Sequence, residues 1–136
     1  MPAQPGCVFC KIVAGELPAH VVSQDDRTIA FLDINPASAG HTLVVPRAHA
    51  RDLIEIGAED LTAVAFGAQR VATALRDRLG ADGVNLINSC GAAAWQVVFH
   101  FHVHVIPRYA GDRLRHPWIP ARGDPDTLAS IAARLR

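Results

Sequence analysis

The sequence lacks several features that would place it in a broad class of proteins. It has no excess of basic charge, because thirteen Lys and Arg residues balance thirteen Asp and Glu residues over 136 positions. The basic residues never cluster beyond Arg113 to Arg115, so the broad cationic field of a duplex-binding protein is absent. Aromatic residues make up 6% of the chain, too few for a platform that stacks single-stranded bases. No apolar run approaches the roughly 20 residues that cross a bilayer. We therefore expect no nucleic-acid partner and no membrane association.

Cysteine is also scarce. Cys7 and Cys10 are separated by two residues and Cys90 stands alone, which is typical of a reduced intracellular chain rather than a disulfide-stapled one. The N-terminus shows no basic leader followed by a long apolar stretch, so we expect a cytoplasmic protein. Half of the residues are apolar, enough for one compact core, and no linker divides the chain. We expect a single domain over residues 1–136.

The periodicity of apolar residues and the position of turn residues predict the secondary structure. Apolar residues recur at intervals of three and four from Glu59 to Leu79, which predicts one long amphipathic helix. A short helix is expected from Cys7 to Ala14, and a terminal helix begins at Asp124 and Pro125. Strands are predicted at 21–23, 28–33, 41–45, 84–88 and 97–106, with a loop at 89–95. This order is typical of the α+β class, an antiparallel sheet of about five strands with helices on one face.

Three histidines alternate with apolar residues in the segment Phe99–Ile106, at His100, His102 and His104. Alternate residues of a strand share a face, so the three imidazoles line one side. Histidines in such positions can also simply be buried in a core or exposed on a polar face. One metal shared by all three is strained, because the outer Cβ atoms lie about 13 Å apart and nitrogens on one zinc only ~3.3 Å apart. A neutral imidazole is a competent nucleophile near pH 7, so the row suits attack on phosphorus.

The row resembles the histidine-triad (HIT) motif, in which three alternating histidines precede two apolar residues. Further segments match the same family in order and approximate spacing: Phe31–Pro36, Gly40–Pro46, His49, Asn88 and Gln96. Together they resemble the Hint branch, the histidine triad nucleotide-binding proteins, over residues 7–108. Residues 109–136 form a C-terminal extension outside this resemblance.

The resemblance implies a nucleotide hydrolase or transferase of the phosphoramidase kind, with a HIT-type sheet and a homodimeric assembly. By motif position, His102 attacks the α-phosphorus and forms a covalent nucleotidyl-enzyme that water then opens. The carbonyl of the residue matching His100 helps to orient that ring, His104 contacts the phosphate, and His41 supports the site from behind. Such chemistry needs no redox cofactor.

The resemblance also implies a pocket for a purine nucleotide or a nucleotide conjugate. Asp33 matches the aspartate that binds the ribose hydroxyls, although an aspartate before Asn35 and Pro36 can equally cap a turn. Apolar positions that match those sandwiching the base are otherwise ordinary core residues: Val8, Phe9, Ile12, Phe31 and Ile34. Asn88 and Gln96 are expected to join His102 and His104 at the phosphate, but amides in such loops also cap turns.

Cys7 and Cys10 form half of a tetrahedral zinc site. A redox pair or two small core thiols are the alternatives. The resemblance implies a structural zinc whose other ligands are His49 and His100, without displacing His102 as the nucleophile.

Two departures from the Hint pattern leave other functions open. Val97 stands where serine or threonine usually donates to the leaving group, and the loop from Ser89 to Trp95 is poorer in glycine. A dinucleoside polyphosphate hydrolase, whose leaving groups need less help, is the nearest alternative. A nucleotide-binding or scaffold module with little catalysis and a metal-dependent hydrolase are the others.

Overall fold

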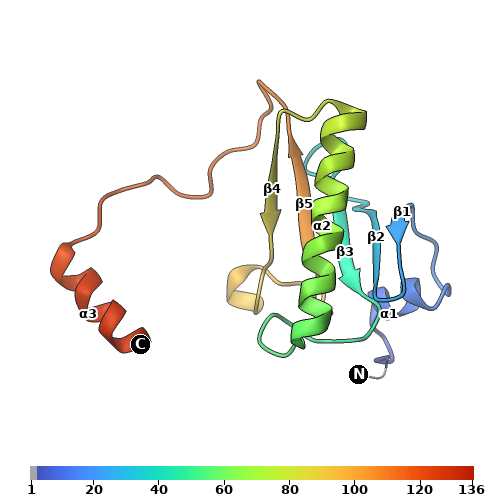
Figure 1. The fold of residues 1–136 in the computed structure, drawn as a ribbon, viewed down its shortest axis with the longest axis horizontal. Coiled ribbons are helices and arrows are strands. Elements are labelled where there is room, and N and C mark those ends of the chain that lie inside the picture. The colour runs from blue at the N-terminus through green and yellow to red at the C-terminus, as the bar shows by residue number, and fades with distance from the viewer. Residues whose placement is uncertain (1–2) are drawn as a thin grey trace.

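The computed structural model describes residues 3–136 and contains a five-stranded antiparallel sheet with one long helix along it (Figure 1). The strand order is β1-β2-β3-β5-β4, which confirms the predicted α+β class. The elements in chain order are α1 Val8–Val13, β1 Val21–Gln24, β2 Thr28–Leu32, β3 Thr42–Pro46, α2 Ala58–Leu79, β4 Gly83–Ile87, the short 3₁₀ helix Ala92–Ala94, β5 Val103–Arg108 and α3 Pro125–Leu135.

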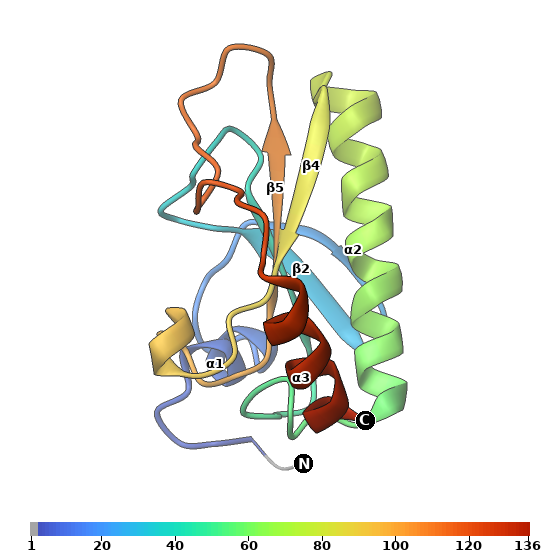
Figure 2. The same cartoon turned by 90° about the vertical axis from the view of Figure 1, so that its left-hand side faces the viewer.

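Both faces of the sheet are covered, which differs from the expectation of helices on one face only. Val44 of β3 packs in the apolar cluster that includes Val64 of α2. Its neighbour Leu43 points the other way, into a second cluster with Phe9 of α1 and Phe31 of β2. Figure 2 shows α1 and α2 on opposite sides of the sheet. The central strands β2 and β3 are buried on both faces, so each face requires its own cover.

The strand that follows the histidine row begins later than predicted, at Val103 rather than at residue 97. The preceding backbone leaves the sheet, because the Phe101 N–H donates to the carbonyl of Ala50 at 2.7 Å. His100 and His102 therefore lie on an irregular segment that leads into β5, and His104 lies within the strand. Since His104 pairs directly with Leu43 of β3, its side chain shares the α1 face of the sheet.

Gly40 allows the chain to turn into β3 beneath the end of α2. Its φ is +102°, and a Cβ at this position would meet Leu75 Cδ2 and Leu79 Cδ1 at 2.8 Å. Only glycine combines that dihedral angle with such a close approach. The turn places His41 immediately before β3, at the edge of the histidine cluster described below.

The loop before the histidine row contains a 3₁₀ turn that ends at Trp95, whose φ of 75° is left-handed. A bulky residue in this conformation is strained, so the left-handed backbone at Trp95 raises the free energy of the folded loop. No helix within residues 3–136 has both the length and the apolarity to cross a bilayer.

Candidate active site

His102 lies where the irregular segment enters β5, with its ring against Phe9 of α1 at a centroid distance of 5.1 Å. Its Nδ1 is 2.7 Å from the carbonyl oxygen of His100. Because a carbonyl can only accept, Nδ1 carries the proton and donates it, and Nε2 keeps a free lone pair. Burial lowers the pKa of His102, so the ring is neutral near pH 7. A buried neutral imidazole with one fixed tautomer is the state that a nucleophile requires.

A second chain of hydrogen bonds fixes the tautomers of His41 and His104. The backbone N–H of Ala37 donates to His41 Nδ1 at 3.0 Å, so the His41 proton is on Nε2. That nitrogen lies 2.9 Å from His104 Nδ1. His41 therefore donates to His104, and the remaining His104 proton is on Nε2. The rings of His102 and His104 are 5.0 Å apart between centroids, which places a hydrogen-bond donor beside His102.

The electrostatics of this pair favour neutral rings. Burial lowers the pKa of His104 to about 4, and the neighbouring His102 and His41 oppose its protonation further. Burial also lowers the pKa of His41, although the nearby Asp33 carboxylate acts in the opposite direction. The pair thus acts at neutral pH as a donor of a hydrogen bond rather than as a fixed positive charge.

Asp33 follows β2 and caps a turn, which is one of the two roles considered from the sequence; its role at a ribose stays a prediction. Its Oδ1 accepts the N–H of Asn35 at 2.8 Å and so caps the turn. Its Oδ2 lies 3.6 Å from His41 Nε2 and 4.0 Å from His104 Nδ1, and keeps lone pairs for a ligand. These three side chains are close enough to hold a cation, but the bond between the two histidines already uses both of their facing nitrogens.

A separate cluster of two thiols and two imidazoles lies at the N-terminus of α1. Cys7 Sγ is 3.4 Å from His100 Nδ1, Cys10 Sγ is 3.3 Å from His49 Nδ1, and the two Nδ1 atoms are 3.2 Å apart. His100 Nε2 donates to the carbonyl of Pro46 at 2.8 Å, so its Nδ1 lone pair faces the thiols. The sequence-predicted set is thus brought together in space.

The geometry and chemistry of this cluster suit a tetrahedral metal ion. Sulfur and nitrogen ligands on one zinc lie about 3.3 to 3.8 Å apart, and the four ligand atoms here all lie within 4.8 Å of one another. Burial raises the pKa of the Cys10 thiol, so a thiolate there requires a cation beside it. Backbone N–H groups of Cys10 and Gln4 point at the two sulfurs. The residues therefore fit a metal ion, which they could hold.

The apolar residues predicted for the base divide into two groups. Phe9 and Phe31 are 6% and 3% exposed and form part of the core, where their rings pack edge to face. Ile34, at 84% exposure, and the less exposed Val8 and Ile12 remain available to a ligand.

A groove of about 510 Å³ borders Val8 and continues past Val97 and Phe99 to the metal-ligand cluster. The Arg51 guanidinium lies over the Phe99 ring, 5.3 Å from its centroid. This groove does not include His102, so it adjoins the histidine row rather than containing it. The prediction of a base pocket stays a prediction.

The two amides predicted at the phosphate are largely committed to the protein. Asn88 donates one N–H to the His102 carbonyl at 2.9 Å. Gln96 accepts from the Gly91 N–H and donates to the carbonyls of Arg51 and Val98. Each amide thus braces the backbone around the row, and Gln96 would have to release a bond to reach a phosphate.

Sequence reasoning missed the backbone groups that set the tautomers. The N–H of Ala37 and the carbonyl of Pro46 each determine which nitrogen of a histidine is protonated. Neither residue type signals this role, because every residue except proline carries the same N–H and every residue carries the same carbonyl.

Comparison with known proteins is consistent with this geometry. The sequence model of the HIT domain matches residues 14–111. The chain belongs to the HIT family. Its relatives include an uncharacterized HIT-like protein of Methanocaldococcus jannaschii, 47% identical over 106 residues that cover 78% of this chain and 81% of the relative. The adenylylsulfatase HINT3 of Arabidopsis thaliana is 40% identical over 82% of this chain, but the match spans only 56% of the plant protein.

Several solved structures resemble nearly the whole of this chain. A protein of Streptococcus mutans superimposes with a TM-score of 0.93 at 38% identity and covers 98% of this chain and 85% of its own. A zinc-bound histidine triad family protein of Mycobacterium smegmatis has a TM-score of 0.78 at 39% identity, with 95% and 97% covered. A histidine triad nucleotide-binding protein of Candida albicans has a TM-score of 0.83 at 29% identity, with 96% and 94% covered. Membership of the HIT family supports nucleotide binding and hydrolase or transferase activity for this chain.

Proposed function

We propose that this HIT protein cleaves a nucleoside monophosphate from a phosphorus-linked leaving group through a covalent nucleotidyl intermediate on His102. The observation that carries the proposal is the bond between His102 Nδ1 and the His100 carbonyl, because it leaves Nε2 unprotonated. In the first step Nε2 bonds to the α-phosphorus and the bond to the leaving group breaks, so that the leaving group departs with the electron pair. Water then attacks phosphorus, releases His102 and yields the nucleoside monophosphate and a proton.

The neighbouring histidine pair supports the charge that develops on phosphorus. His104 presents an N–H at Nε2, because its Nδ1 accepts from His41. A donor held in this way by a second ring needs no reorganisation during the reaction and stabilises a phosphoryl oxygen. The free lone pairs of Asp33 suit the two vicinal hydroxyls of a ribose, and the exposed Val8 and Ile34 suit an apolar base such as a purine.

The leaving group that these residues favour is one that departs without a proton. Val97 is 84% exposed at the border of the groove and carries no donor, so nothing at this position assists a poor amine. Sulfate and nucleoside polyphosphates leave as stable anions. The relation to an adenylylsulfatase and the dinucleoside polyphosphate alternative both agree with such a leaving group.

We further propose a structural zinc ion held by Cys7, Cys10, His49 and His100, and a homodimer as the working form. Support for zinc comes from the ligand geometry and from the zinc-bound relative. The ion would tie α1 to the segment before β5 and so hold the backbone carbonyl that orients His102. A zinc ion held there would cross-link the fold, whereas the proposed chemical step belongs to the histidines.

Mass spectrometry of quenched turnover tests the proposal. Purified protein is mixed with adenylyl sulfate, diadenosine polyphosphate or adenosine phosphoramidate and quenched in milliseconds to seconds. We expect an added nucleotidyl mass on the peptide that contains His102, absent from His102→Ala and present in the control His20→Ala, which alters an exposed histidine. Full turnover by His102→Ala would contradict the proposal. Tight binding of a nucleoside monophosphate without any adduct would favour a binding module.

A further inference from the structure

The loop that joins β2 to β3 supplies the N–H that fixes the tautomer of His41, but it has little packing of its own. The Ala37 N–H donates to His41 Nδ1 at 3.0 Å, and the His41 N–H donates to the Ser38 carbonyl at 3.1 Å. The residues from Asn35 to Ala37, and Ala39, are exposed. Segments with few buried contacts open at a low cost in free energy. The loop therefore needs anchors elsewhere if the Ala37 N–H is to stay on the ring.

Two hydroxyl groups anchor this loop to the end of β5. Ser38 Oγ donates to the Pro107 carbonyl at 2.6 Å. The Tyr109 hydroxyl donates to the Ala39 carbonyl, also at 2.6 Å. The first bond is partly buried and ends on a fully buried proline, so it is shielded from competition with water. Because β5 also carries His104, the two hydroxyls tie the loop to the strand that holds the other ring of the histidine pair.

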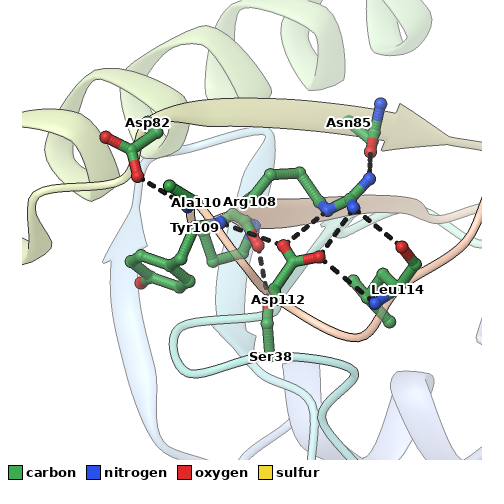
Figure 3. A network of polar contacts seen from close by, with 9 residues as sticks. Ser38, Asp82, Asn85, Arg108, Tyr109, Ala110, Asp112 and Leu114 are labelled. Atoms are coloured by element: carbon green, nitrogen blue, oxygen red, sulfur yellow. Dashed lines mark hydrogen bonds and ion pairs between the residues drawn. The ribbon is translucent and has the colours of Figure 1, made fainter.

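The end of β5 is itself firmly held. Asp112 accepts the Tyr109 N–H at 3.0 Å and forms a two-bond ion pair with the Arg108 guanidinium at 2.7 and 2.8 Å. Figure 3 shows Asp112 at the centre of this turn, with Ser38 on the loop below it. The Tyr109 ring packs against the apolar cluster between α2 and the sheet. A side chain held both at its backbone and at its ring presents its hydroxyl in one direction.

We propose that Ser38 and Tyr109 are positioning residues for the histidine pair. By holding the loop they keep the Ala37 N–H on His41 Nδ1, and so keep the His41 proton on Nε2, where it is donated to His104. His104 then presents its own proton at Nε2. The inference rests on the function proposed above, in which that N–H meets a phosphoryl oxygen.

The pair has a second arrangement, which the loop disfavours. With the His41 proton on Nδ1, His104 would donate from Nδ1 to His41 Nε2, and His104 Nε2 would present a lone pair to the phosphoryl oxygen. Each neutral ring keeps one proton in both arrangements, but the second makes two N–H groups face each other at Ala37, which is costly in a partly buried place. The Asp33 carboxylate, 3.6 Å from His41 Nε2, also favours the first arrangement. Asp33 is, however, the proposed partner of the ribose, whereas the Ala37 N–H acts whether or not a ligand is bound.

Nitrogen NMR of the histidine rings tests the positioning directly, because ring nitrogens with and without a proton resonate far apart. Spectra of ¹⁵N-histidine protein are recorded at pH 8, where both rings are neutral because burial lowers their pKa. Ser38→Ala and Tyr109→Phe each remove one hydroxyl, and Ser23→Ala alters another half-buried serine, on β1. We expect His41 Nδ1 and His104 Nδ1 to move toward the protonated position and the two Nε2 resonances to move the opposite way. The movement should be largest in the double variant and absent in Ser23→Ala.

Steady-state kinetics with adenylyl sulfate provides the second measurement. Removal of either hydroxyl should lower kcat about fivefold, the effect of one hydrogen bond of ordinary strength, and should change KM by less than about twofold, because neither hydroxyl contacts the substrate. Urea unfolding verifies that Ser38→Ala and Ser23→Ala remain folded. Unchanged ring resonances in the double variant would overturn the proposal, as would a change in KM alone or a loss of stability with native tautomers. Absence of turnover by the native chain would contradict the proposed function instead, and the spectra would still decide whether the hydroxyls hold the pair.

Discussion

Replacing His104 should make the protein less sensitive to acid. Burial lowers the pKa of His104 to about 4, against an ordinary value of 6.5. As the pH falls through 6.5, His104 binds a proton in the unfolded chain but stays neutral in the folded chain. The free energy of unfolding therefore decreases. The stability contributed by the neutral ring is complete above pH 6.5 and is lost progressively down to pH 4.

The size of the effect follows from the same two values. Linkage of a group that titrates at 6.5 when unfolded and near 4 when folded gives a loss of about 2 kcal/mol between pH 7.5 and pH 5. The His104 side chain is 24% exposed, so solvent screening removes little of this. Its neighbours His41 and His102 have pKa values lowered in the same direction, and the native protein should therefore lose more than this amount in total.

Urea unfolding at pH 7.5, 6.5, 5.5 and 5 measures the effect in the native chain, in His104→Gln and in His20→Gln. The difference between pH 7.5 and pH 5 should shrink by about 2 kcal/mol in His104→Gln and stay unchanged in His20→Gln, because His20 is exposed. Acid release of a metal affects all three proteins alike and cancels in the comparison. An equal loss in all three proteins would refute the reasoning, as would an NMR titration of His104 near pH 6.5.

Three further predictions concern the metal, the leaving group and the turn before β3. Zinc added at a hundredfold excess over its dissociation constant should stabilise the protein, after a chelator has removed any metal, by about 3 kcal/mol. Elemental analysis should then find one ion per chain, and an unchanged thermal midpoint would contradict the proposed site. Val97→Ser should raise kcat for an adenosine phosphoramidate about tenfold, because a hydrogen-bond donor to the leaving nitrogen contributes roughly 1.4 kcal/mol. The same substitution should leave kcat for adenylyl sulfate unchanged. Equal effects on both substrates would contradict the role given to position 97. Gly40→Ala should lower the free energy of unfolding by about 2 kcal/mol or more, because its Cβ would meet Leu75 and Leu79 at 2.8 Å. Urea unfolding measures the loss, with Gly57→Ala as the control because a Cβ at that position meets open space. Equal losses in the two variants would disprove the packing argument.

The helices could be predicted closely from the sequence because their signals are local. The periodicity at 59–79 and the capping residues before α3 specify each helix without reference to the rest of the chain. The start of β5 could not be predicted in this way. It depends on the bond between Phe101 and Ala50, which are distant in sequence, whereas the alternation of apolar and polar residues continues through the break.

The side chains that form the candidate metal cluster could be predicted from the sequence for a different reason. Histidine and cysteine are rare, so their spacing is informative, and the structure brings Cys7, Cys10, His49 and His100 into one cluster as expected. The covering of both sheet faces was missed because Phe9 and Ile12 fit a helix packed on either face equally well.

Identical side chains at alternate positions are suited to different tasks here because each ring has one nitrogen bound to a different partner. His100 uses Nε2 on the Pro46 carbonyl and turns Nδ1 to the thiols. His102 uses Nδ1 on the His100 carbonyl, which leaves the lone pair of Nε2 free. His104 accepts from His41 at Nδ1 and is left with a donor at Nε2. One ring is thereby suited to a metal, the next to a nucleophile and the third to a phosphate oxygen, although their pattern in the sequence is uniform. Because His100 contributes an imidazole to the proposed metal cluster and a backbone carbonyl to His102, His100→Ala should remove the metal ligand but keep the carbonyl, whose position would then depend on the protein bonds around it alone. Loss of metal with a retained nucleotidyl adduct on His102 would separate the two roles of this one residue.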